Sequence, residues 1–554
     1  MMTSWTRRQF LAAATAGPAL ATFSGEGRTT LCSSMPGIPP QLRPGADGET
    51  PLHLPSTVGG AGVRFANTPN WAREAPALFV PDTLSAGSGL LHFPHSVLLR
   101  DQIKSFHDLP ALVEQAQSIG TNIVYLVDWY EGGWTKKGDY LPDPEFGGEP
   151  AFRQGLAAAH RAGGRIILYV EGLIAEKSTN IARQHGAEWS IIGKNNQPIE
   201  NPFPGNWKMC PATAGWASHL EDVSRRVAAY GADGIYWDDW GDPEEYACHS
   251  SAHHHPIGQT QVYDNGQIAI ARRVRAALEA GRPDGAIMVT EGNFRQPLFE
   301  FVDGSLSWSM SYFMTRWAWN SQGGTDTFVP CFSLDDWNQA VAVGAKLACP
   351  LQFLSPPPGQ SAVAFLDGEL AKWNPERGKV ITPSIVWGLN KWRNAGLILG
   401  LRVPGLGDIG AFPLAMGGEA PRDFLEELRP RAAAIDSALD RRQAPAATAY
   451  LKALLTARGS LARLIDHGSS VEQVGPRQNP AAGHVPPGAA AWRFTGANGI
   501  ALTTVNVADE PCQVAFPNVS GTWRDAVTGE EFVARGGTLT VSVPAHRARL
   551  LHSS

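Results

Sequence analysis

The sequence GADGIYWDDW, residues 231–240, joins a short apolar segment to two adjacent acidic residues. Residues 234–237 have the composition of a buried β-strand, and Asp238 and Asp239 follow where that strand should end. Burying ionisable groups costs free energy, so carboxylates at the end of a core strand indicate a functional role. In an α/β barrel, active sites are built at the carboxyl ends of the strands. The stretch therefore predicts such a barrel, with its active site at the end of this strand.

Short apolar runs alternate with helical patterns on both sides of this stretch, which is typical of βα units and a parallel sheet. Near-continuous apolar strands, each covered by a helix, favour a closed (β/α)8 TIM barrel over an open doubly wound sheet. Residues 381–388 and 395–401 compete for the closing strand. The remaining expected strands cover residues 122–128, 165–170, 234–238, 286–291, 302–310 and 348–354.

The pattern changes to period two near the C-terminus, where short strands are separated by turn signals. This pattern predicts a small antiparallel β-sandwich after a linker rich in Pro and Gly at residues 475–488. The expected divisions are a signal peptide at 1–24, a linker or arm at 25–90, the catalytic barrel at 91–470 and the sandwich at 484–554.

The N-terminus carries an export signal. Residues 6–11, TRRQFL, form a twin-arginine pattern, and an Ala-rich apolar run follows it. Ala19-Leu20-Ala21 supplies the small residues of a cleavage site. The run is too short to span a bilayer as a stable helix, so we expect no membrane association after cleavage. This route exports folded proteins and predicts a periplasmic or secreted protein.

Composition limits the classes of partner. The chain has 554 residues, 18% of them charged, and a net charge of −6, which gives no electrostatic argument for binding nucleic acid or an anionic membrane. Its 18 Trp residues suit stacking on sugar rings as well as core packing. Six Cys residues without CxxC spacing are too sparse for a disulfide scaffold.

Two carboxylates at consecutive strand ends carry the predicted chemistry. Asp238 ends one strand and Glu291 ends the next, so both side chains should converge over the barrel mouth. Glycoside hydrolysis needs such a pair, one carboxylate at the anomeric carbon and one carboxylic acid that protonates the leaving oxygen. Neighbouring strands provide the separation of about 5 Å that a retaining mechanism requires. Helix capping by Asp238 and a surface position for Glu291 are the competing structural interpretations.

The period of a strand separates the two aspartates. Tyr236, Asp238 and Trp240 share one face, and Trp237 and Asp239 share the other. Only one face can point into the barrel. We therefore expect Asp238 to point inward, and Asp239 to point outward and bond a neighbouring backbone group or a Trp N–H.

The segment Asp233-Gly-Ile-Tyr-Trp-Asp238 resembles the fourth-strand nucleophile motif D-G-x-x-x-D of retaining α-glycoside hydrolases, including the α-amylase clan. It is most similar to the motif of endo-α-N-acetylgalactosaminidase-like enzymes, because an aromatic residue precedes the Asp and Trp240-Gly241 follows. In both groups the acid/base is a Glu at the end of the fifth strand, which Glu291 matches. The resemblance, which covers residues 95–310 best, implies a barrel with a C-terminal sandwich, Asp238 as nucleophile and Glu291 as acid/base.

Two features depart from the α-amylase clan. That clan has an Arg two residues before its nucleophile, where this chain has Tyr236. The chain also shows no seventh-strand His-Asp pair. The resemblance therefore does not imply ordinary starch chemistry.

Further substrate-binding candidates follow other strands. Asp128 ends the first clear strand, and Trp129 beside it could provide a stacking platform for a sugar. Glu171 ends the following strand in the same manner. Structural roles and core packing compete with binding for all of these residues. The remaining candidates are Tyr236, Asp239, Trp308, Tyr312 and Arg316.

A loop rich in histidine follows the strand expected at residues 234–238. His249 and residues 253–255 suggest a metal site, but consecutive histidines rarely direct their rings at one ion, and no Cys or carboxylate spacing supports zinc. We therefore expect a solvated active-site loop, with no metal ligands and no cofactor.

These features together predict an exported glycoside hydrolase that acts on α-linked oligosaccharides, polysaccharides or glycoconjugates by a retaining mechanism. A rival hypothesis is an α-galactosidase-like barrel that uses a sixth-strand Asp as the acid, for which Asp303 is the candidate. Its position near the start of that strand argues against it. The sequence is also compatible with a non-catalytic carbohydrate-binding barrel and with a metal-dependent hydrolase that uses the histidine loop.

Overall fold

The computed structural model describes two main parts of the chain, one around residues 103–349 and one around residues 444–553. The described residues are 77–79, 103–133, 136–200, 205–240, 246–282, 284–290, 301–306, 326–330, 334–349, 444–465, 470–474, 488–496, 499–508 and 510–553, with a few isolated positions besides.

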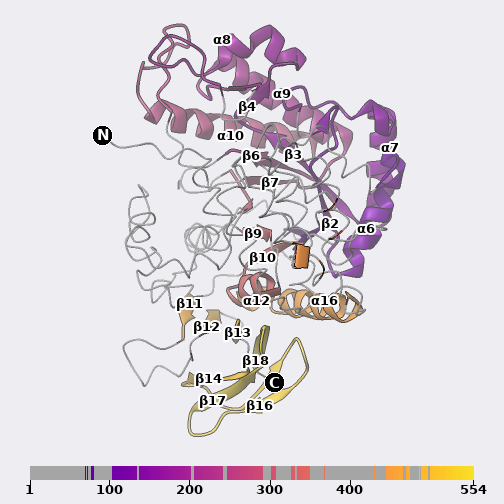
Figure 1. Cartoon of the computed structure of the whole chain (residues 1–554), viewed down its shortest axis with the longest axis vertical. Helices are drawn as coiled ribbons and strands as arrows, with labels where there is room; N and C mark the ends of the chain where they lie inside the picture. The colour runs from indigo at the N-terminus through magenta and orange to yellow at the C-terminus, as the bar shows by residue number, and fades with distance from the viewer. Residues whose placement is uncertain are drawn as a thin grey trace.

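Eight parallel strands form a closed barrel, and their order around the ring follows the chain. Figure 1 shows most of these strands between the outer helices, above the C-terminal sheets. The strands are β1 (Ala77–Phe79), β2 (Ile123–Leu126), β3 (Arg165–Glu171), β6 (Gly234–Asp238), β7 (Ile287–Thr290), β8 (Gly304–Leu306), β9 (Asp326–Pro330) and β10 (Lys346–Cys349). The predicted strands at 122–128, 165–170, 234–238 and 286–291 are confirmed.

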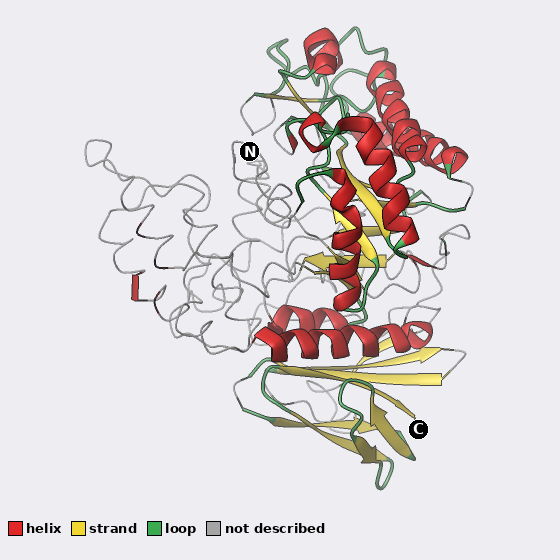
Figure 2. Cartoon of the chain, turned by 90° about the vertical axis from the view of Figure 1, so that its right-hand side faces the viewer, coloured by secondary structure: helices red, strands yellow, loops and turns green. Residues whose placement is uncertain are grey.

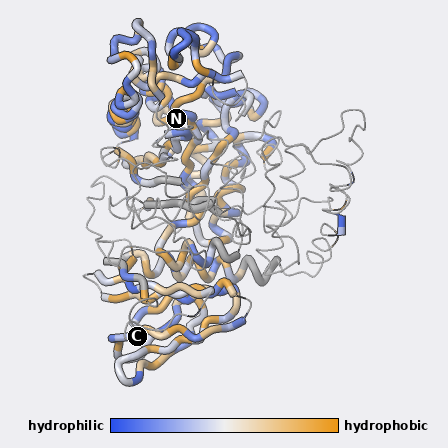
Figure 3. Tube along the Cα trace, turned by 60° about the vertical axis from the view of Figure 1, so that its left-hand side comes forward, coloured by the Kyte–Doolittle hydropathy of each residue, from blue (hydrophilic) through white to orange (hydrophobic). Residues whose placement is uncertain are grey.

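Helices on the outside of the barrel connect successive strands. In α9, the side chains of Trp216, Leu220, Val223 and Val227 recur at helical spacing and are buried against the barrel. The helix ends at Gly231, whose φ of 103° is left-handed, and the chain turns there into β6. Figure 3 shows apolar segments concentrated in the interior and polar segments on the outer helices. The connecting helices are α6 (Leu109–Ser118), α7 (Gly148–Arg161), α9 (Ala214–Tyr230), α10 (Gln261–Gly281) and α12 (Leu334–Ala342).

The barrel closes differently from the sequence prediction. β1 lies inside the segment 25–90, which the sequence assigns to a linker or arm, and it pairs with both β2 and β10. Three apolar residues are too few to show a periodicity, so the sequence alone does not reveal this strand. Residues 381–388 and 395–401, the expected closing strands, lie outside the described residues; the pairing of β1 with β10 already completes the ring.

Two antiparallel sheets follow the barrel and share a core that includes Leu502, Trp523, Val514 and Val541. The larger sheet has the order β11-β12-β13-β18-β15-β16, and the smaller pairs β14 with β17. The predicted C-terminal sandwich begins earlier than residue 484, because residues 475–488 connect two of its strands. The strands are β11 (Ser470–Gln473), β12 (Ala489–Gly496), β13 (Gly499–Asn506), β14 (Cys512–Pro517), β15 (Thr522–Asp525), β16 (Glu531–Val533), β17 (Thr538–Val543) and β18 (Arg547–Ser553).

The sandwich is joined to the barrel through α12 and α16 (Ala444–Ser460), which lie between the two parts in Figure 2. Tyr450 donates its hydroxyl hydrogen to Asn338 Oδ1 at 2.6 Å, and the Asn338 amide donates to the carbonyl of His546 at 2.9 Å. Thr503 of β13 donates to the carbonyl of Ala342 at the end of α12. None of the described helices has the length and apolarity to cross a bilayer.

Candidate active site

Asp238 is the last residue of β6, at the carboxyl end of the barrel strands, and is only 4% exposed. Both of its oxygens accept hydrogen bonds from tyrosines. The Tyr169 hydroxyl donates to Oδ2 at 2.7 Å, and the Tyr236 hydroxyl donates to Oδ1 at 3.1 Å. Hydrogen bonds to an ionised group compensate for the loss of water on burial. The carboxylate is therefore held in one orientation by two neutral donors.

The register between β3 and β6 explains this geometry. It pairs Tyr169 with Tyr236 and Glu171 with Asp238 across the two parallel strands. Residues two apart in a strand share a face, so all four side chains lie on the same side of the sheet. The Tyr236 ring also contacts Tyr125 of β2, the strand on the other side of β3, with ring centroids 5.2 Å apart. The sequence thus builds a layer of aromatic rings beneath a layer of carboxylates.

Glu171 lies beside Asp238 and is fully buried. Its Oε2 is 3.4 Å from both the Tyr169 hydroxyl and the Lys137 ammonium nitrogen. The Lys137 charge offsets one of the two neighbouring negative charges, which would otherwise repel each other strongly because both carboxylates are buried. The Tyr140 hydroxyl accepts a hydrogen bond from the Glu171 N–H at 2.9 Å and fixes the backbone at this strand end.

Three of the buried tyrosines near the carboxylates have raised pKa values. Burial raises the pKa of Tyr169 well above its ordinary value, and the charges of Asp238 and Glu171 raise it further. Burial also raises the pKa values of Tyr130 and Tyr140, again with contributions from neighbouring charges. All three phenols are therefore protonated at neutral pH, and Tyr169 keeps the proton that it donates to Asp238.

Asp239 does not continue the strand. Its φ of 60° is left-handed, a conformation that Asp tolerates better than most residues, so the simple alternation of faces ends at Asp238. Its Oδ2 lies 3.1 Å from the ammonium nitrogen of Lys208, and both side chains are buried. Lys208 ends β5 (Asn206–Lys208), which pairs with β4 (Ile174–Glu176) in a two-stranded antiparallel sheet after β3. The sequence predicts a backbone group or a Trp N–H as a partner of Asp239. The contact with Lys208 is instead an ion pair.

The predicted binding surface includes Trp129, but the structure buries this residue. Its indole is fully buried, stacks on Phe152 of α7 with an interplanar angle of 10° and donates to the Tyr169 carbonyl at 2.9 Å. The ring faces the helix layer and offers no platform to a sugar. Asp128, the residue before it, is also buried, and its charge contributes to the raised pKa of Tyr130 near the carboxylates.

Asp233 directly precedes β6 and lies at the opposite end of this strand from Asp238. It binds the side chains of His160, Arg165 and Arg282 at 2.7 to 2.9 Å. These contacts connect the strand starts to the helix ends. Asp233 therefore has a structural role in the D-G-x-x-x-D motif.

Asp303, the rival candidate for the acid, directly precedes β8. It forms a buried ion pair with Arg275 and accepts a hydrogen bond from the Met288 N–H at 2.8 Å. This position is at the start of the strand and away from Asp238, as the sequence indicates.

Four predicted site residues lie outside the described residues, so the structure does not test their roles. β7 ends at Thr290, which pairs with Trp237, so the described part of this strand ends one residue before the predicted acid/base. The four residues are Glu291, Trp308, Tyr312 and Arg316.

Several polar residues of the site are absent from the sequence prediction. Tyr169 precedes Glu171 by two residues, and this spacing is the one signal that could have revealed it. Lys137 and Tyr140 come from a loop and Lys208 from the short strand β5, whose positions depend on the fold.

A second cluster includes two residues of the histidine loop, which the sequence predicts to be solvated and without metal ligands. Cys210, Cys248, His253 and His255 bring their donor atoms within 4.8 Å of one another. The two cysteines are far apart in sequence, so their spacing gives no zinc motif.

A protein family described as a domain of unknown function, DUF6259, matches residues 63–332. No curated protein matches the chain.

Solved structures share the fold at low sequence identity. Isomaltulose synthase (PalI) from Klebsiella sp. LX3 has a TM-score of 0.53 and 12% identity, over 87% of this chain and 99% of that chain. A family GH13_31 enzyme has a TM-score of 0.53 and 11% identity, over 87% and 99%. The α-glucosyl transfer enzyme XgtA has a TM-score of 0.52 and 13% identity, over 88% and 100%. At these identities the likeness shows the fold alone, a barrel followed by a C-terminal β-domain.

Proposed function

We propose that this chain is an exported glycoside hydrolase that cleaves α-linked substrates with retention of configuration. The observation that carries the proposal is Asp238, a buried carboxylate at the carboxyl end of a barrel strand whose two oxygens are held by Tyr169 and Tyr236. Fixed orientation at this end of a barrel is what a carboxylate nucleophile needs. The solved structures with this fold include a GH13_31 enzyme, which supports the same reaction class.

In the proposed reaction, an oxygen of Asp238 attacks the anomeric carbon, and the bond from that carbon to the leaving oxygen breaks. Glu291 gives its proton to the leaving oxygen. It then takes a proton from water, which attacks the anomeric carbon and releases Asp238. The two carboxyl groups return to their starting protonation states.

The place of Glu291 in the chain supports its role as acid/base. Thr290, the last residue of β7, pairs with Trp237, and Asp238 and Glu291 are the next residues of their respective segments. Neighbouring strands are about 4.8 Å apart. That spacing agrees with the carboxyl separation of about 5–5.5 Å that retaining enzymes use.

Tyr236 supports a substrate class other than starch. Where the α-amylase clan has an Arg, this chain has a neutral hydroxyl that donates to Asp238. The resemblance to endo-α-N-acetylgalactosaminidase-like enzymes makes N-acetylgalactosamine and galactose the first sugars to test. The twin-arginine pattern supports export to the periplasm or the medium, which cell fractionation of the full chain and of an Arg7→Lys/Arg8→Lys variant would test.

The experiment is hydrolysis of aryl α-glycosides of galactose, N-acetylgalactosamine and glucose by the full chain and by Asp238→Asn. We expect one glycoside to be cleaved and Asp238→Asn to lose on the order of 10³-fold or more in kcat. Asp222→Asn, at an exposed aspartate of α9, is the matched control and should keep full activity.

Azide should restore turnover of Asp238→Gly and give a glycosyl azide, because the small anion fills the space of the missing carboxylate. Rescue of an Asp239 variant instead would overturn the assignment of the nucleophile. Sugar binding without hydrolysis of any glycoside would favour a non-catalytic carbohydrate-binding protein.

A further inference from the structure

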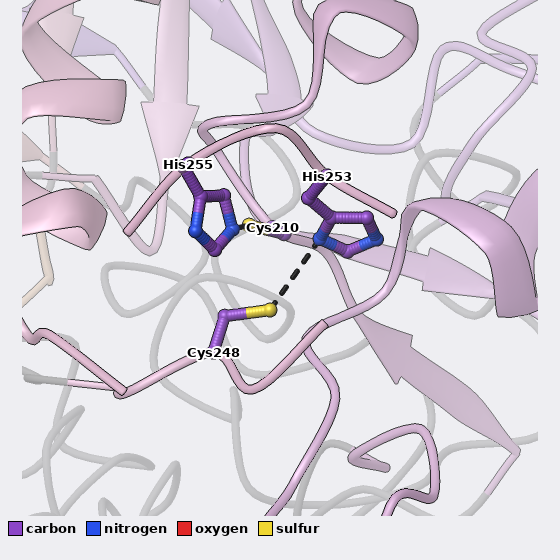
Figure 4. A group of neighbouring side chains, drawn as sticks. All are labelled: Cys210, Cys248, His253 and His255. Atoms are coloured by element: carbon purple, nitrogen blue, oxygen red, sulfur yellow. Dashed lines mark hydrogen bonds between the residues drawn. The ribbon is translucent and has the colours of Figure 1, made fainter. Parts of the chain in front are cut away.

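Two cysteine and two histidine side chains, all potential metal ligands, lie close together beside the barrel mouth. They come from two segments of the chain. Cys210 follows β5, whereas Cys248, His253 and His255 belong to the connection between β6 and α10. Both thiols are buried, with exposed fractions of 1% and 3%. Figure 4 shows the two imidazole rings directed toward the two sulfur atoms.

Hydrogen bonds on the outer sides of the rings fix which nitrogens face the cluster. His253 Nε2 lies 2.7 Å from the carbonyl oxygen of Glu188, and His255 Nδ1 lies 3.1 Å from that of Pro256. A carbonyl oxygen only accepts, so each of these nitrogens carries the hydrogen. In the neutral rings the inner nitrogens, Nδ1 of His253 and Nε2 of His255, therefore present lone pairs to the cluster. Metal-binding histidines are oriented by such outer contacts.

Two sulfur–nitrogen distances within the cluster match those of tetrahedral zinc. Cys248 Sγ lies 3.4 Å from His253 Nδ1, and Cys210 Sγ lies 3.5 Å from His255 Nε2. Zinc bonds of about 2.3 Å to sulfur and about 2.0–2.1 Å to nitrogen, at a tetrahedral angle, imply a separation of about 3.6 Å between the two donors. The Ile192 N–H also points at Cys248 Sγ, at 3.4 Å.

The backbone holds the two segments in place around these donors. The Cys210 N–H donates to the Trp189 carbonyl at 2.9 Å, and the Gly258 N–H donates to the Cys248 carbonyl at 2.8 Å. Between the two histidines, His254 has a φ of 56°, which turns the chain so that its neighbours both face the cluster.

We propose that Cys210, Cys248, His253 and His255 bind one zinc ion in a closed structural site that links the two segments. Four protein ligands complete the tetrahedral shell, so no position is left for a reacting water. The site would support the active site indirectly. Lys208, which binds Asp239, lies two residues before Cys210.

The predicted export route is compatible with a thiolate site. Twin-arginine signals act on folded proteins, so zinc would be bound in the reducing cytoplasm, where both thiols stay reduced. The rival state is a disulfide between Cys210 and Cys248 formed after export. It would leave the two histidines without a common ligand.

The test is the zinc content of the full chain, purified without added metal or chelator and measured by plasma mass spectrometry. We expect about one zinc per chain, and Co²⁺ added to zinc-depleted protein should give the visible spectrum of a tetrahedral site with thiolate charge transfer. His253→Ala and His255→Ala should each lower the zinc content at least about tenfold. His254→Asn is the matched control, because Asn tolerates the left-handed backbone. Cys512→Ser, at a cysteine of the sandwich, is the second control.

Zinc well below one equivalent in the purified chain, together with no cobalt spectrum after reduction of the thiols, would overturn the proposal. A Cys210–Cys248 crosslink in non-reducing peptide mapping of the periplasmic protein would overturn it in favour of the disulfide. Both readouts use the unsubstituted chain, so a variant that fails to fold does not weaken them. They also do not depend on glycosidase activity.

Discussion

The Tyr169 hydroxyl donates a 2.7 Å hydrogen bond to Asp238 Oδ2 and thereby connects two adjacent barrel strands at their carboxyl ends. The donor is a neutral phenol, and the pKa of Tyr169 is raised, first by burial and then by the two nearby carboxylates. A neutral donor orients the carboxylate without the strong charge pairing that an Arg would provide. Asp238 is thus held in place in a way that suits its proposed role as nucleophile.

Tyr169→Phe should lower kcat about 10- to 100-fold with little change in KM, because a hydrogen bond to a charged group is worth about 1.5–3 kcal/mol. Steady-state kinetics on the best aryl glycoside would measure this loss. Tyr230→Phe, at the far end of α9, is the control and should leave both constants unchanged. A variant with unchanged kcat would show that the Tyr236 contact alone orients Asp238.

Breaking the buried pair between Lys208 and Asp239 should destabilise the fold strongly. Lys208→Met leaves a buried carboxylate without this partner, at a cost of about 3–5 kcal/mol, and Asp239→Asn leaves the ammonium in the same condition. The double variant should be more stable than the sum of the single effects predicts. Thermal unfolding of the four proteins measures the coupling. Strict additivity would mean that the pair contributes nothing beyond its separate side chains.

Stability should fall above about pH 10. The pKa values of Tyr130, Tyr140 and Tyr169 are raised in the folded chain, whereas in the unfolded chain these phenols ionise near pH 10. Unfolding therefore releases protons above that pH. The stabilisation is fully present below about pH 10 and is lost as pH rises toward the folded values. Melting temperatures from about pH 8 to 11 should decline less steeply for Tyr169→Phe; identical slopes would contradict this linkage.

The variant Asp303→Asn distinguishes between Glu291 and Asp303 as the catalytic acid. The substitution removes the charge that pairs with Arg275, so we expect a lower melting temperature but a kcat within about twofold of the original chain. An α-galactosidase-like mechanism requires instead that Asp303→Asn abolish hydrolysis of aryl glycosides at temperatures where the variant is folded.

The sequence predicts the features that depend on local pattern. The strand that ends in Asp238 is readable because apolar residues, a preceding helix and Gly231 follow one another within a single segment. The change from helical period to period two predicts the C-terminal sheets for the same reason. The three-residue β1 is not predicted, because it is too short to carry a period.

The contacts that make the site specific join residues distant in sequence. Lys137 meets Glu171, and Lys208 meets Asp239, only after loops fold over the strand ends. Trp129 is a residue whose local sequence suggests a role that the fold does not support. An aromatic residue next to an acid suggests a binding platform, but the position of α7 covers the face of this ring. Cys210 also lies close to His253 and His255 only in the folded chain, because more than 40 residues separate them in sequence.

Asn338 carries a consequence for how this chain can change over evolutionary time. Its side chain accepts from Tyr450 of α16 and donates to His546, so one barrel helix depends on residues that lie far toward the C-terminus. A recombination event that exchanges the sandwich alone would leave α12 with unmatched polar groups and uncovered apolar surface. We therefore expect barrel and sandwich to be inherited together, and related chains to diversify their substrates through loops at the strand ends.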